Sequence, residues 1–286
     1  MKLLVTGAGG QLGVDVVMHA ESVGDDVVAV DRAVLDITDP VAVRELLDAV
    51  RPDAVINAAA YTAVDACETN EALAFAVNAD AVGHLSAACE LRGTHLVHVS
   101  TDYVFDGTLD RPYREDDATN PQSVYGRSKL AGEQAAGPAA AVARTSWVCG
   151  EHGNNLVKLV LRLASNPDQA LAFVDDQRGH PTFTADLAPV LRQLAVDRRV
   201  GIHHLTNQGA VNWYEFVREI LSAAGHDPDR VVPISTSDLD PPRPAPRPAN
   251  SVLDNAVWRA AGLPPLRDFR EPLADLLAKL RGQTSV

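Results

Sequence analysis

Cysteine is scarce in this sequence of 286 residues, and the three cysteines lie far apart. Cys67, Cys89 and Cys149 form no Cys-x-x-Cys pair, so their spacing predicts neither a disulfide framework nor a zinc site. A chain of this length buries a sizeable core without such cross-links. The cysteine usage favours a reduced, cytoplasmic setting.

Long apolar runs and an excess of positive charge are also lacking. No segment approaches the ~20 consecutive apolar residues of a membrane span, and the first strand leads straight into glycines, which leaves no room for an export signal. Lys and Arg number 25 against 38 Asp and Glu, a formal net charge of −13. We therefore expect no membrane partner and no nucleic-acid partner.

The sequence does contain short apolar runs that alternate with segments of helical periodicity. Strands are predicted at 2–6, 26–30, 54–57, 95–99, 141–145 and 202–205, and helices at 11–23, 40–50, 70–91, 124–136, 155–164, 184–195 and 212–224. Most of these strands are apolar throughout, which indicates burial on both faces and a parallel sheet. The predicted fold class is α/β, a doubly wound parallel sheet. The proline-rich run 241–248 joins two ordered parts, so we expect it to fold over the protein.

A glycine-rich loop follows the first predicted strand and opens the first helix. Gly7, Gly10 and Gly13 have the spacing of a dinucleotide-binding loop, with a tight turn, a close backbone approach to the pyrophosphate and close packing of helix on strand. The helix N-terminus adds N–H groups and positive potential. Asp31 follows the second strand, where its carboxylate can accept hydrogen bonds from the adenosine ribose of NADH. Arg32 comes next and can instead bind the 2′-phosphate of NADPH. The choice between NADH and NADPH stays open.

Tyr125 and Lys129 stand four residues apart, on one face of a predicted helix. An ammonium beside a phenol stabilises the phenolate and lowers its pKa, which suits Tyr125 to proton transfer. Lys129 is also expected to hold the nicotinamide ribose. Thr101 ends the fourth predicted strand, where ligands bind in open α/β sheets. We therefore predict Tyr125, Lys129 and Thr101 as the catalytic residues.

Longer motifs extend this pattern along nearly the whole chain. They are 57–65 (NAAAYTAVD), 100–107 (STDYVFDG), 124–133 (VYGRSKLAGE), 144–147 (RTSW), the residues Asp176, Gln177, Gly179, Pro181 and Thr182, and 247–251 (RPANS). Together with the glycine loop they resemble the extended short-chain dehydrogenases, and more closely the dTDP-4-dehydrorhamnose reductase family. That resemblance implies reduction of the 4-keto group of dTDP-4-dehydro-β-L-rhamnose to dTDP-β-L-rhamnose.

The resemblance also implies residue roles. Tyr125 resembles the proton donor, Lys129 its partner and Thr101 the tuning hydroxyl. Residues that resemble the cofactor lining are Gly10, Gln11, Leu12, Asp31, Asp36, Ile37, Ala58, Ala59 and Ala60. Those that resemble the sugar site are Thr101, Asp102, Tyr125 and Trp147. Arginine binds phosphate in a bidentate manner, so the diphosphate is placed along 243–251, with Arg247 as a contact. A plain surface strap is the alternative for that stretch.

The resemblance also bears on domains and assembly. It predicts a dinucleotide-binding (Rossmann) domain at 1–147 and 182–208 and a smaller, discontinuous substrate domain at 148–181 and 209–286. Some members of the family dimerise around magnesium, and Asp15 lies in the corresponding region. The other ligands have no match, so no metal is assigned and a homodimer stays open.

Four other functions compete with this assignment. A sugar-nucleotide dehydratase needs an additional acid after the threonine and aspartate of the strand end, where this chain has Tyr103. An epimerase, or a reductase of another 4-keto sugar nucleotide, is not distinguished by the sequence. A cofactor-binding regulatory subunit is the alternative from another class, and the intact Thr101, Tyr125 and Lys129 set argues for catalysis.

Overall fold

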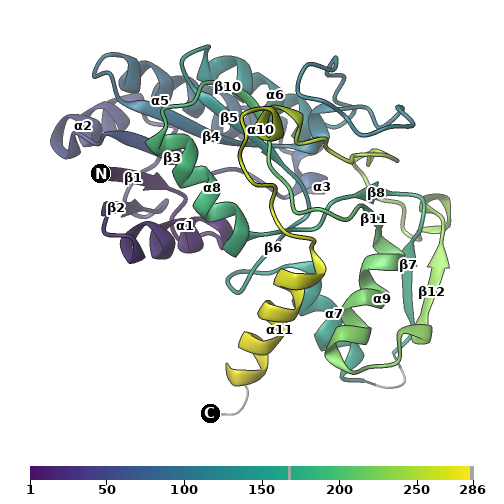
Figure 1. Cartoon of the computed structure of the whole chain (residues 1–286). Helices are drawn as coiled ribbons and strands as arrows, with labels where there is room; N and C mark the ends of the chain where they lie inside the picture. The colour runs from purple at the N-terminus through teal and green to yellow at the C-terminus, as the bar shows by residue number, and fades with distance from the viewer. Residues whose placement is uncertain (167–168, 284–286) are drawn as a thin grey trace.

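A computed structural model describes residues 1–166 and 169–283. Its centre is a six-stranded sheet in which all neighbouring strands are parallel (Figure 1). In spatial order the strands are β10 (Gly201–His204), β5 (Ala141–Thr145), β4 (His95–Thr101), β3 (Ala54–Asn57), β1 (Lys2–Thr6) and β2 (Asp26–Val30). Successive strands run outward in both directions from β1 and β3, which confirms the doubly wound parallel sheet.

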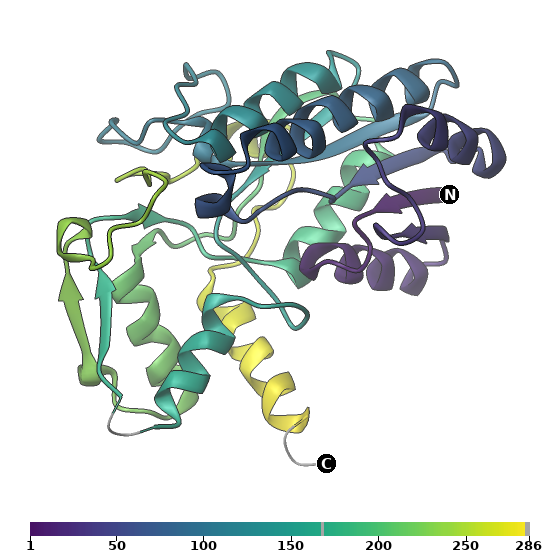
Figure 2. The same cartoon turned by 180° about the vertical axis from the view of Figure 1, so that it is seen from behind.

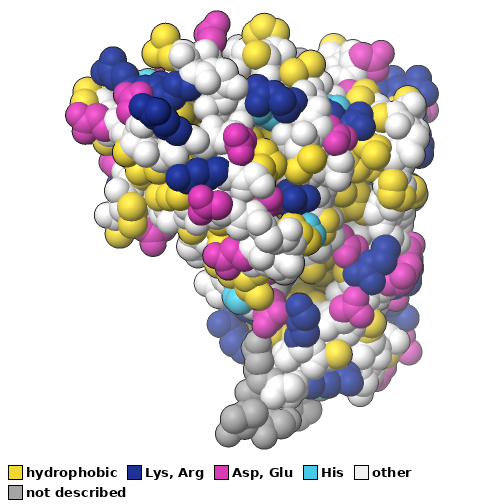
Figure 3. All heavy atoms as spheres, turned by 60° about the vertical axis from the view of Figure 1, so that its left-hand side comes forward, with side chains coloured by type: hydrophobic (Ala, Val, Ile, Leu, Met, Phe, Trp, Pro, Cys, Tyr) yellow, Lys and Arg dark blue, Asp and Glu magenta, His cyan; other side chains and the backbone are white. Residues whose placement is uncertain are grey.

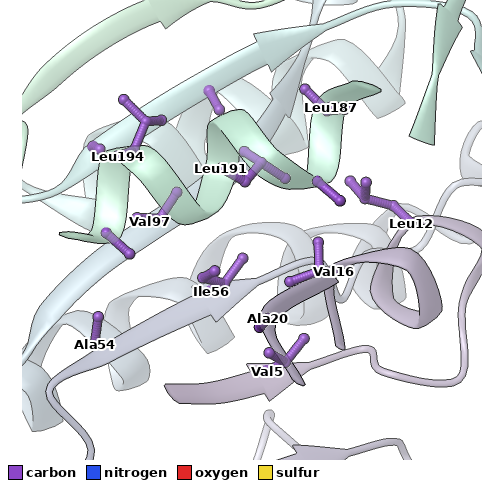
Figure 4. Close-up of a cluster of buried hydrophobic side chains, with 14 of the residues drawn as sticks. Val5, Leu12, Val16, Ala20, Ala54, Ile56, Val97, Leu187, Leu191 and Leu194 are labelled. Carbon is purple, nitrogen blue, oxygen red and sulfur yellow. The ribbon is translucent and has the colours of Figure 1, made fainter. Parts of the chain in front are cut away.

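Helices cover both faces of this sheet because its strands are apolar on both sides. On one face lie α1 (Gln11–Ser22) and α8 (Thr184–Val196), and on the other α2 (Pro40–Val50), α5 (Ala81–Glu90) and α6 (Val124–Ala136). Figure 4 shows Leu187, Leu191 and Leu194 of α8 facing Ile56 and Val97 of the strands across the first of these layers. These two apolar layers hold the sheet in place, and with it the edge at which the strands have their carboxyl ends.

One predicted helix is interrupted. The sequence predicts a single helix over 70–91, whereas the structure has α4 (Glu71–Phe75), a π-helical turn η1 (Ala76–Asp80) and then α5. The Asn78 side chain accepts from the backbone N–H of Tyr61 at 2.8 Å and donates to its carbonyl at 3.1 Å. A Cβ on Gly132 of α6 would lie 2.0 Å from the Asn78 carbonyl oxygen. The turn therefore widens where it meets both a loop and a crossing helix.

The run Glu71–Glu90 is long and apolar enough to cross a membrane by length and composition alone. In this fold 44% of its most apolar window is buried inside the molecule. Its buried side chains, among them Val82 and Leu85, pack with Leu47 of α2 and Leu96 of β4. These contacts account for the hydropathy of the run as that of a core helix.

A smaller body stands at the carboxyl edge of the sheet (Figures 1 and 2). It contains α7 (Leu156–Ala164), α9 (Trp213–Ala224), α11 (Arg270–Gln283) and the parallel pair β7 (Leu171–Val174) and β12 (Val231–Ile234) around its own apolar cluster. Two short ladders lie on the segments that run between this body and the sheet: β6 (Val148–Cys149) with β9 (Thr182–Phe183), and β8 (Arg178–Gly179) with β11 (Val211–Asn212). The remaining elements are α3 (Val64–Cys67), η2 (Asp102–Val104), η3 (Pro228–Arg230), η4 (Thr236–Asp238) and α10 (Ala256–Ala260). The domain boundaries stay a prediction.

The proline-rich segment 241–248 folds over the protein, as predicted. Ala245 is buried, and its N–H donates to the Asp65 carboxylate at 3.1 Å. Gly107 has a φ of 80°, and a Cβ there would lie 2.6 Å from the Pro248 side chain. The face shown in Figure 3 carries acidic and basic side chains interspersed, rather than a patch of one sign.

Candidate active site

The glycine loop has the conformation that its spacing predicts. Gly7 has a φ of 68°, the left-handed region that favours glycine, and its carbonyl accepts from the Gly10 N–H at 2.9 Å. A Cβ on Gly13 would lie 2.1 Å from the Gly7 carbonyl oxygen. The start of α1 is thereby held close against the end of β1.

A cavity of about 530 Å³ opens above this loop, where β2 and β3 lie on opposite sides of β1. This is the switch point at which open α/β sheets bind ligands. Nine of the predicted cofactor residues line it: Gly7, Gly10, Asp31, Arg32, Asp36, Ile37, Ala58, Ala59 and Ala60. Further lining residues that no sequence motif indicated include Leu73, Ala76 and Val77 from the interrupted helix. Glycine backbone, a helix N-terminus and apolar walls fit a dinucleotide.

Three residues predicted to bind the cofactor make their contacts outside this cavity. The Gln11 amide donates to the Val148 carbonyl at 2.9 Å, Leu12 packs in the core beneath the sheet, and Gly13 packs on Gly7. In the part of the chain that the structure describes, these three residues are not among those that line the cavity. What they offer toward it is the backbone N–H groups that a helix leaves without partners at its first turn. Their role toward a cofactor stays a prediction.

Asp31 and Arg32 both lie at the rim of the cavity, but only the Asp31 side chain has hydrogen-bond partners among the described residues. One Asp31 oxygen accepts from the N–H groups of Ala33 and Val34, at 2.9 and 3.2 Å. Arg32 is exposed and forms no ion pair with any residue that the structure describes. The hydroxyl of Thr38 lowers the pKa of Asp36, and the charge of Arg32 adds a smaller effect. Arg32 is therefore the guanidinium still available to an anionic group.

Thr101 and Tyr125 come together at the carboxyl end of β4. Ser123 caps α6 by accepting from the Gly126 N–H at 3.1 Å, which fixes the turn that carries Tyr125. Burial raises the pKa of the Tyr125 phenol, and a hydrogen bond with Thr101 opposes that shift. The ring meets that of Tyr103 edge to face, with centroids 5.5 Å apart. The phenol is thus held protonated beside a second hydroxyl.

Lys129 lies one helical turn further along α6, but its amine is directed to the sheet. Its Nζ donates to the Val99 carbonyl at 2.6 Å and lies 3.3 Å from Nε2 of His98. Burial lowers the pKa of Lys129 to about 8, against the opposing charge of Glu133. Lys129 is not among the groups that shift the pKa of Tyr125. The expected lowering of the phenol pKa by Lys129 is therefore absent from this arrangement, in which burial dominates.

Behind these residues lie polar side chains whose partners were not predicted from the sequence, and the Ser100 hydroxyl, expected to face a reacting carbonyl, is among them. Arg144 of β5 forms a buried bidentate pair with Glu133 of α6, at 2.9 and 2.7 Å, and Ser100 donates to the same carboxylate at 2.5 Å. Asn57 and His98 are fully buried in neighbouring strands. The signal that could have found them is a polar residue inside an otherwise apolar strand.

Asp102 has one carboxylate oxygen bound and one left over. Its Oδ1 accepts from the Thr101 hydroxyl at 2.9 Å, whereas Oδ2 is buried and has no hydrogen-bond partner in the described part of the chain. Burial raises the pKa of Asp102 to about 6, although the nearby hydroxyls of Ser251 and Thr101 act in the opposite direction. A buried acceptor with spare capacity suits recognition of a ligand hydroxyl.

This shift predicts a pH-dependent effect of Asp102→Asn on stability. The folded-state pKa of about 6 lies above the ordinary value of 3.8, so the folded state binds more protons between those pH values. The wild-type protein consequently loses stability as pH rises through this window, whereas the amide does not ionise. Relative to wild type, Asp102→Asn should gain on the order of 2–3 kcal/mol at pH 8 compared with pH 4.

The measurement is urea unfolding of both proteins at pH 4 and pH 8, with Asp110→Asn as the control. Asp110 is an exposed carboxyl in the loop that follows η2. An Asp102→Asn effect that is the same at both pH values would show that burial does not hold this carboxyl protonated.

The predicted sugar side is narrow. Trp147 stacks on Trp213 of α9, with ring centroids 3.5 Å apart and planes inclined by 10°. A Cβ on Gly179 would lie 2.7 Å from the Trp147 ring, so this glycine makes room for the stack. The space between Tyr103, Trp147, Trp213 and the strap measures about 10 Å³. In this arrangement the space is too small to hold a sugar ring.

Arg247, predicted to contact the substrate, is paired with Asp65 at the start of α3. Its two terminal nitrogens bind the two carboxylate oxygens, one of them at 2.7 Å, and one also donates to the Ala245 carbonyl at 2.6 Å. Its Nε is buried with no hydrogen-bond partner in the described part of the chain. Arg243 is exposed nearby, and its charge helps to lower the pKa of Asp65, after the larger effect of the bond from Arg247.

Asp15 of α1 accepts a hydrogen bond from the Thr184 hydroxyl and lies 3.7 Å from His152. In residues 1–166 and 169–283 no group of three or more His, Cys, Asp or Glu side chains is arranged to hold a metal ion.

A dinucleotide cavity at the switch point of a parallel sheet, with the Thr101–Tyr125 pair at the same edge, defines a nicotinamide-dependent oxidoreductase of the short-chain dehydrogenase class. Within that class, the chain belongs to the family described as the RmlD substrate binding domain, whose sequence model matches residues 1–282. The resemblance found in the motifs is confirmed.

Individual relatives agree with this family. A dTDP-4-dehydrorhamnose reductase of Mycobacterium tuberculosis is 46% identical and covers 100% of this chain and 95% of its own. A probable dTDP-4,6-dihydroxy-2-methyloxan-3-one 4-ketoreductase of Streptomyces antibioticus is 45% identical over 96% of this chain and 94% of its own. A crystal structure of dTDP-4-dehydrorhamnose reductase from Bacillus anthracis in complex with NADP has a TM-score of 0.92 and 34% identity, and covers 97% of this chain and 99% of that one.

Proposed function

We propose that this protein reduces the 4-keto group of dTDP-4-dehydro-β-L-rhamnose to give dTDP-β-L-rhamnose. The observation that carries this proposal is family membership over residues 1–282 combined with the Thr101–Tyr125 pair beside the dinucleotide cavity. Relatives named for this reaction share almost the full length of the chain.

The site residues supply proton transfer and orientation. Nicotinamide dinucleotide, when bound, supplies the hydride that reaches carbon 4. Tyr125 gives its phenolic proton to the carbonyl oxygen, so that the C=O bond becomes CH–OH. Its raised pKa keeps that proton on the phenol at neutral pH, which suits the reductive direction. Thr101, whose hydroxyl bonds to Asp102 at 2.9 Å, is assigned to share the substrate oxygen with Tyr125.

The two bodies of the molecule divide the binding task in this proposal. The residues of 1–147 and 182–208 hold the dinucleotide at the switch point, and those of 148–181 and 209–286 hold the sugar nucleotide. Lys129 is assigned to the nicotinamide ribose. Trp147 and Asp102 are assigned to the sugar, and Arg247, through its buried Nε, to the diphosphate side.

A reductase of a different 4-keto sugar nucleotide is the second candidate. The Streptomyces antibioticus relative, named a 4-ketoreductase of another dTDP sugar, is nearly as similar as the rhamnose reductases. Both candidates use the same hydride and the same proton donor, so only the fit of the sugar separates them.

The test is turnover with dTDP-4-dehydro-L-rhamnose made in situ, with NADPH and NADH oxidation followed separately and the product identified by NMR. Rapid oxidation that yields dTDP-L-rhamnose supports the proposal. Cofactor binding without oxidation would refute it, and oxidation only with other 4-keto sugars would favour the second candidate.

Arg32→Ala should impair use of NADPH far more than use of NADH. A guanidinium bound to the 2′-phosphate contributes about 1.5–3 kcal/mol, so we expect the KM for NADPH to rise roughly 10- to 100-fold. NADH has no such phosphate and serves as the internal control. Equal effects on both cofactors, measured at fixed ionic strength, would place Arg32 outside the phosphate site.

A further inference from the structure

A row of four buried polar side chains runs through the sheet from the end of β1 to α6. Thr6, Asn57 and His98 are register partners on the neighbouring strands β1, β3 and β4. The Thr6 hydroxyl lies 2.7 Å from Asn57 Oδ1, Asn57 Nδ2 lies 3.1 Å from His98 Nδ1, and His98 Nε2 lies 3.3 Å from Lys129 Nζ. None of the four is more than 2% exposed. The row therefore connects β1, the strand before the glycine loop, to Lys129 through polar contacts that are buried from solvent.

The orientation of the Asn57 amide is fixed by a backbone group. The N–H of Ala59 lies 3.1 Å from Asn57 Oδ1, and a backbone N–H only donates. If the amide oxygen and nitrogen exchanged places, the NH₂ group would face the Ala59 N–H, and two donors would meet. Asn57 Nδ2 must therefore face His98, and it also only donates.

The tautomer of His98 follows from this orientation. Because Asn57 donates to Nδ1, that nitrogen is an unprotonated acceptor. Complete burial holds the pKa of His98 well below its usual range, so the ring is neutral and its one proton is on Nε2. The Nε2–H group is directed at Lys129.

Only an uncharged lysine can complete this contact. An ammonium has three donors and no acceptor, and it would face the Nε2–H group as a second donor. A neutral amine accepts from Nε2–H through its lone pair while one of its own hydrogens is donated to the Val99 carbonyl at 2.6 Å. Both hydrogen bonds are satisfied in this form alone.

We propose that His98 is a positioning residue for Lys129, to which it donates Nε2–H whenever the amine is neutral. Uptake of a proton by Lys129 removes the lone pair and breaks the contact, so the charged side chain leaves this position. His98 thereby couples the position of Lys129 to its protonation. This inference concerns Lys129 before substrate binds and does not depend on which sugar is reduced.

The surroundings of the amine agree with this assignment. His98 of β4 lies 3.3 Å from the amine, and Glu133 of α6 is a charged group that acts on it. Glu133 is the one charged group that shifts the pKa of Lys129, and its carboxylate is already bound by Arg144 and Ser100. Burial outweighs it and lowers the pKa of Lys129 to about 8.

The test is NMR of the full-length protein with labelled side chains. With ¹⁵N-histidine, His98 should show a protonated Nε2 and an unprotonated Nδ1. With ¹³Cε-lysine, Lys129 should titrate near pH 8, below the ordinary lysine value of 10.5. Loss of one signal in Lys129→Met assigns it.

His98→Gln separates positioning from a merely structural role. The glutamine carbonyl can accept from an ammonium, so the titration midpoint of Lys129 should rise by about one pH unit or more, a ~10-fold change in its protonation equilibrium. His95→Gln is the matched control, because His95 is buried at the opposite end of the same strand. It should leave the Lys129 midpoint unchanged.

A proton on Nδ1 of His98, or a Lys129 midpoint equal to those of the other lysines, would overturn the inference. An unchanged midpoint in folded His98→Gln would do the same. If that variant does not fold, the two wild-type measurements still decide. Neither uses substrate, so failure of the reductase assay and failure of this inference are distinguishable.

Discussion

Tyr125→Phe should lower kcat by roughly 10²- to 10⁴-fold, the range expected when a general acid is lost. The phenol is the proton donor in the proposed reaction, and phenylalanine keeps the ring that packs edge to face with Tyr103. Cofactor affinity should therefore change little while turnover falls. Steady-state kinetics with saturating NADPH, together with a binding titration, measure the two effects separately.

Tyr214→Phe is the matched control for this variant. Its hydroxyl accepts from Arg218 on α9 in the smaller body, at 3.2 Å, and belongs to none of the proposed site residues. Its turnover should equal that of the wild type. Near-normal turnover of Tyr125→Phe would remove Tyr125 from the reaction.

Gly13→Ala should disrupt both folding and cofactor binding. The new Cβ would lie 2.1 Å from the Gly7 carbonyl oxygen and 2.8 Å from the Ala8 Cα, and both are backbone atoms that cannot rotate away. Overpacking of this kind costs about 1–3 kcal/mol, and this site belongs at the upper end. The loop must shift to relieve the clash, so we expect NADPH affinity to fall ~100-fold, as measured by titration alongside urea unfolding.

Gly83→Ala isolates the effect of the clash from that of the substitution. Gly83 is also helical, in α5, but its Cβ would meet only the Ala135 methyl at 3.7 Å, an ordinary contact. Alanine favours a helix over glycine by about 0.8–1 kcal/mol, so this variant should be slightly stabilised. A Gly13→Ala protein as stable as Gly83→Ala would show that α1 does not depend on close approach to Gly7.

The strand pattern was predictable because the parallel sheet leaves a strong signal. Its strands are apolar on both faces, and the predicted bounds of 54–57 and 141–145 are those of β3 and β5. The break at 76–80 left no such signal, since its cause is a bond from Asn78 to a distant loop and the passage of Gly132. Short ladders such as β8 with β11 depend on tertiary placement and were also missed.

In the site, motifs located the residues but not what holds them. Gly7 and Gly13 followed from spacing, because a positive φ and a close approach need glycine. The pairing of Arg247 with Asp65 joins positions 182 residues apart, and no local pattern encodes it. The direction of the Lys129 amine likewise depends on a carbonyl and an imidazole of β4, which helical spacing alone does not reveal.

The chain passes repeatedly between the sheet and the smaller body. It leaves the sheet after β5, returns at α8, leaves again after β10, and packs back at α10 before it ends in α11. Hydrogen-bonded ladders join these crossings in pairs, β6 with β9 and β8 with β11. A single proteolytic nick in one crossing would therefore leave both bodies covalently joined through the others.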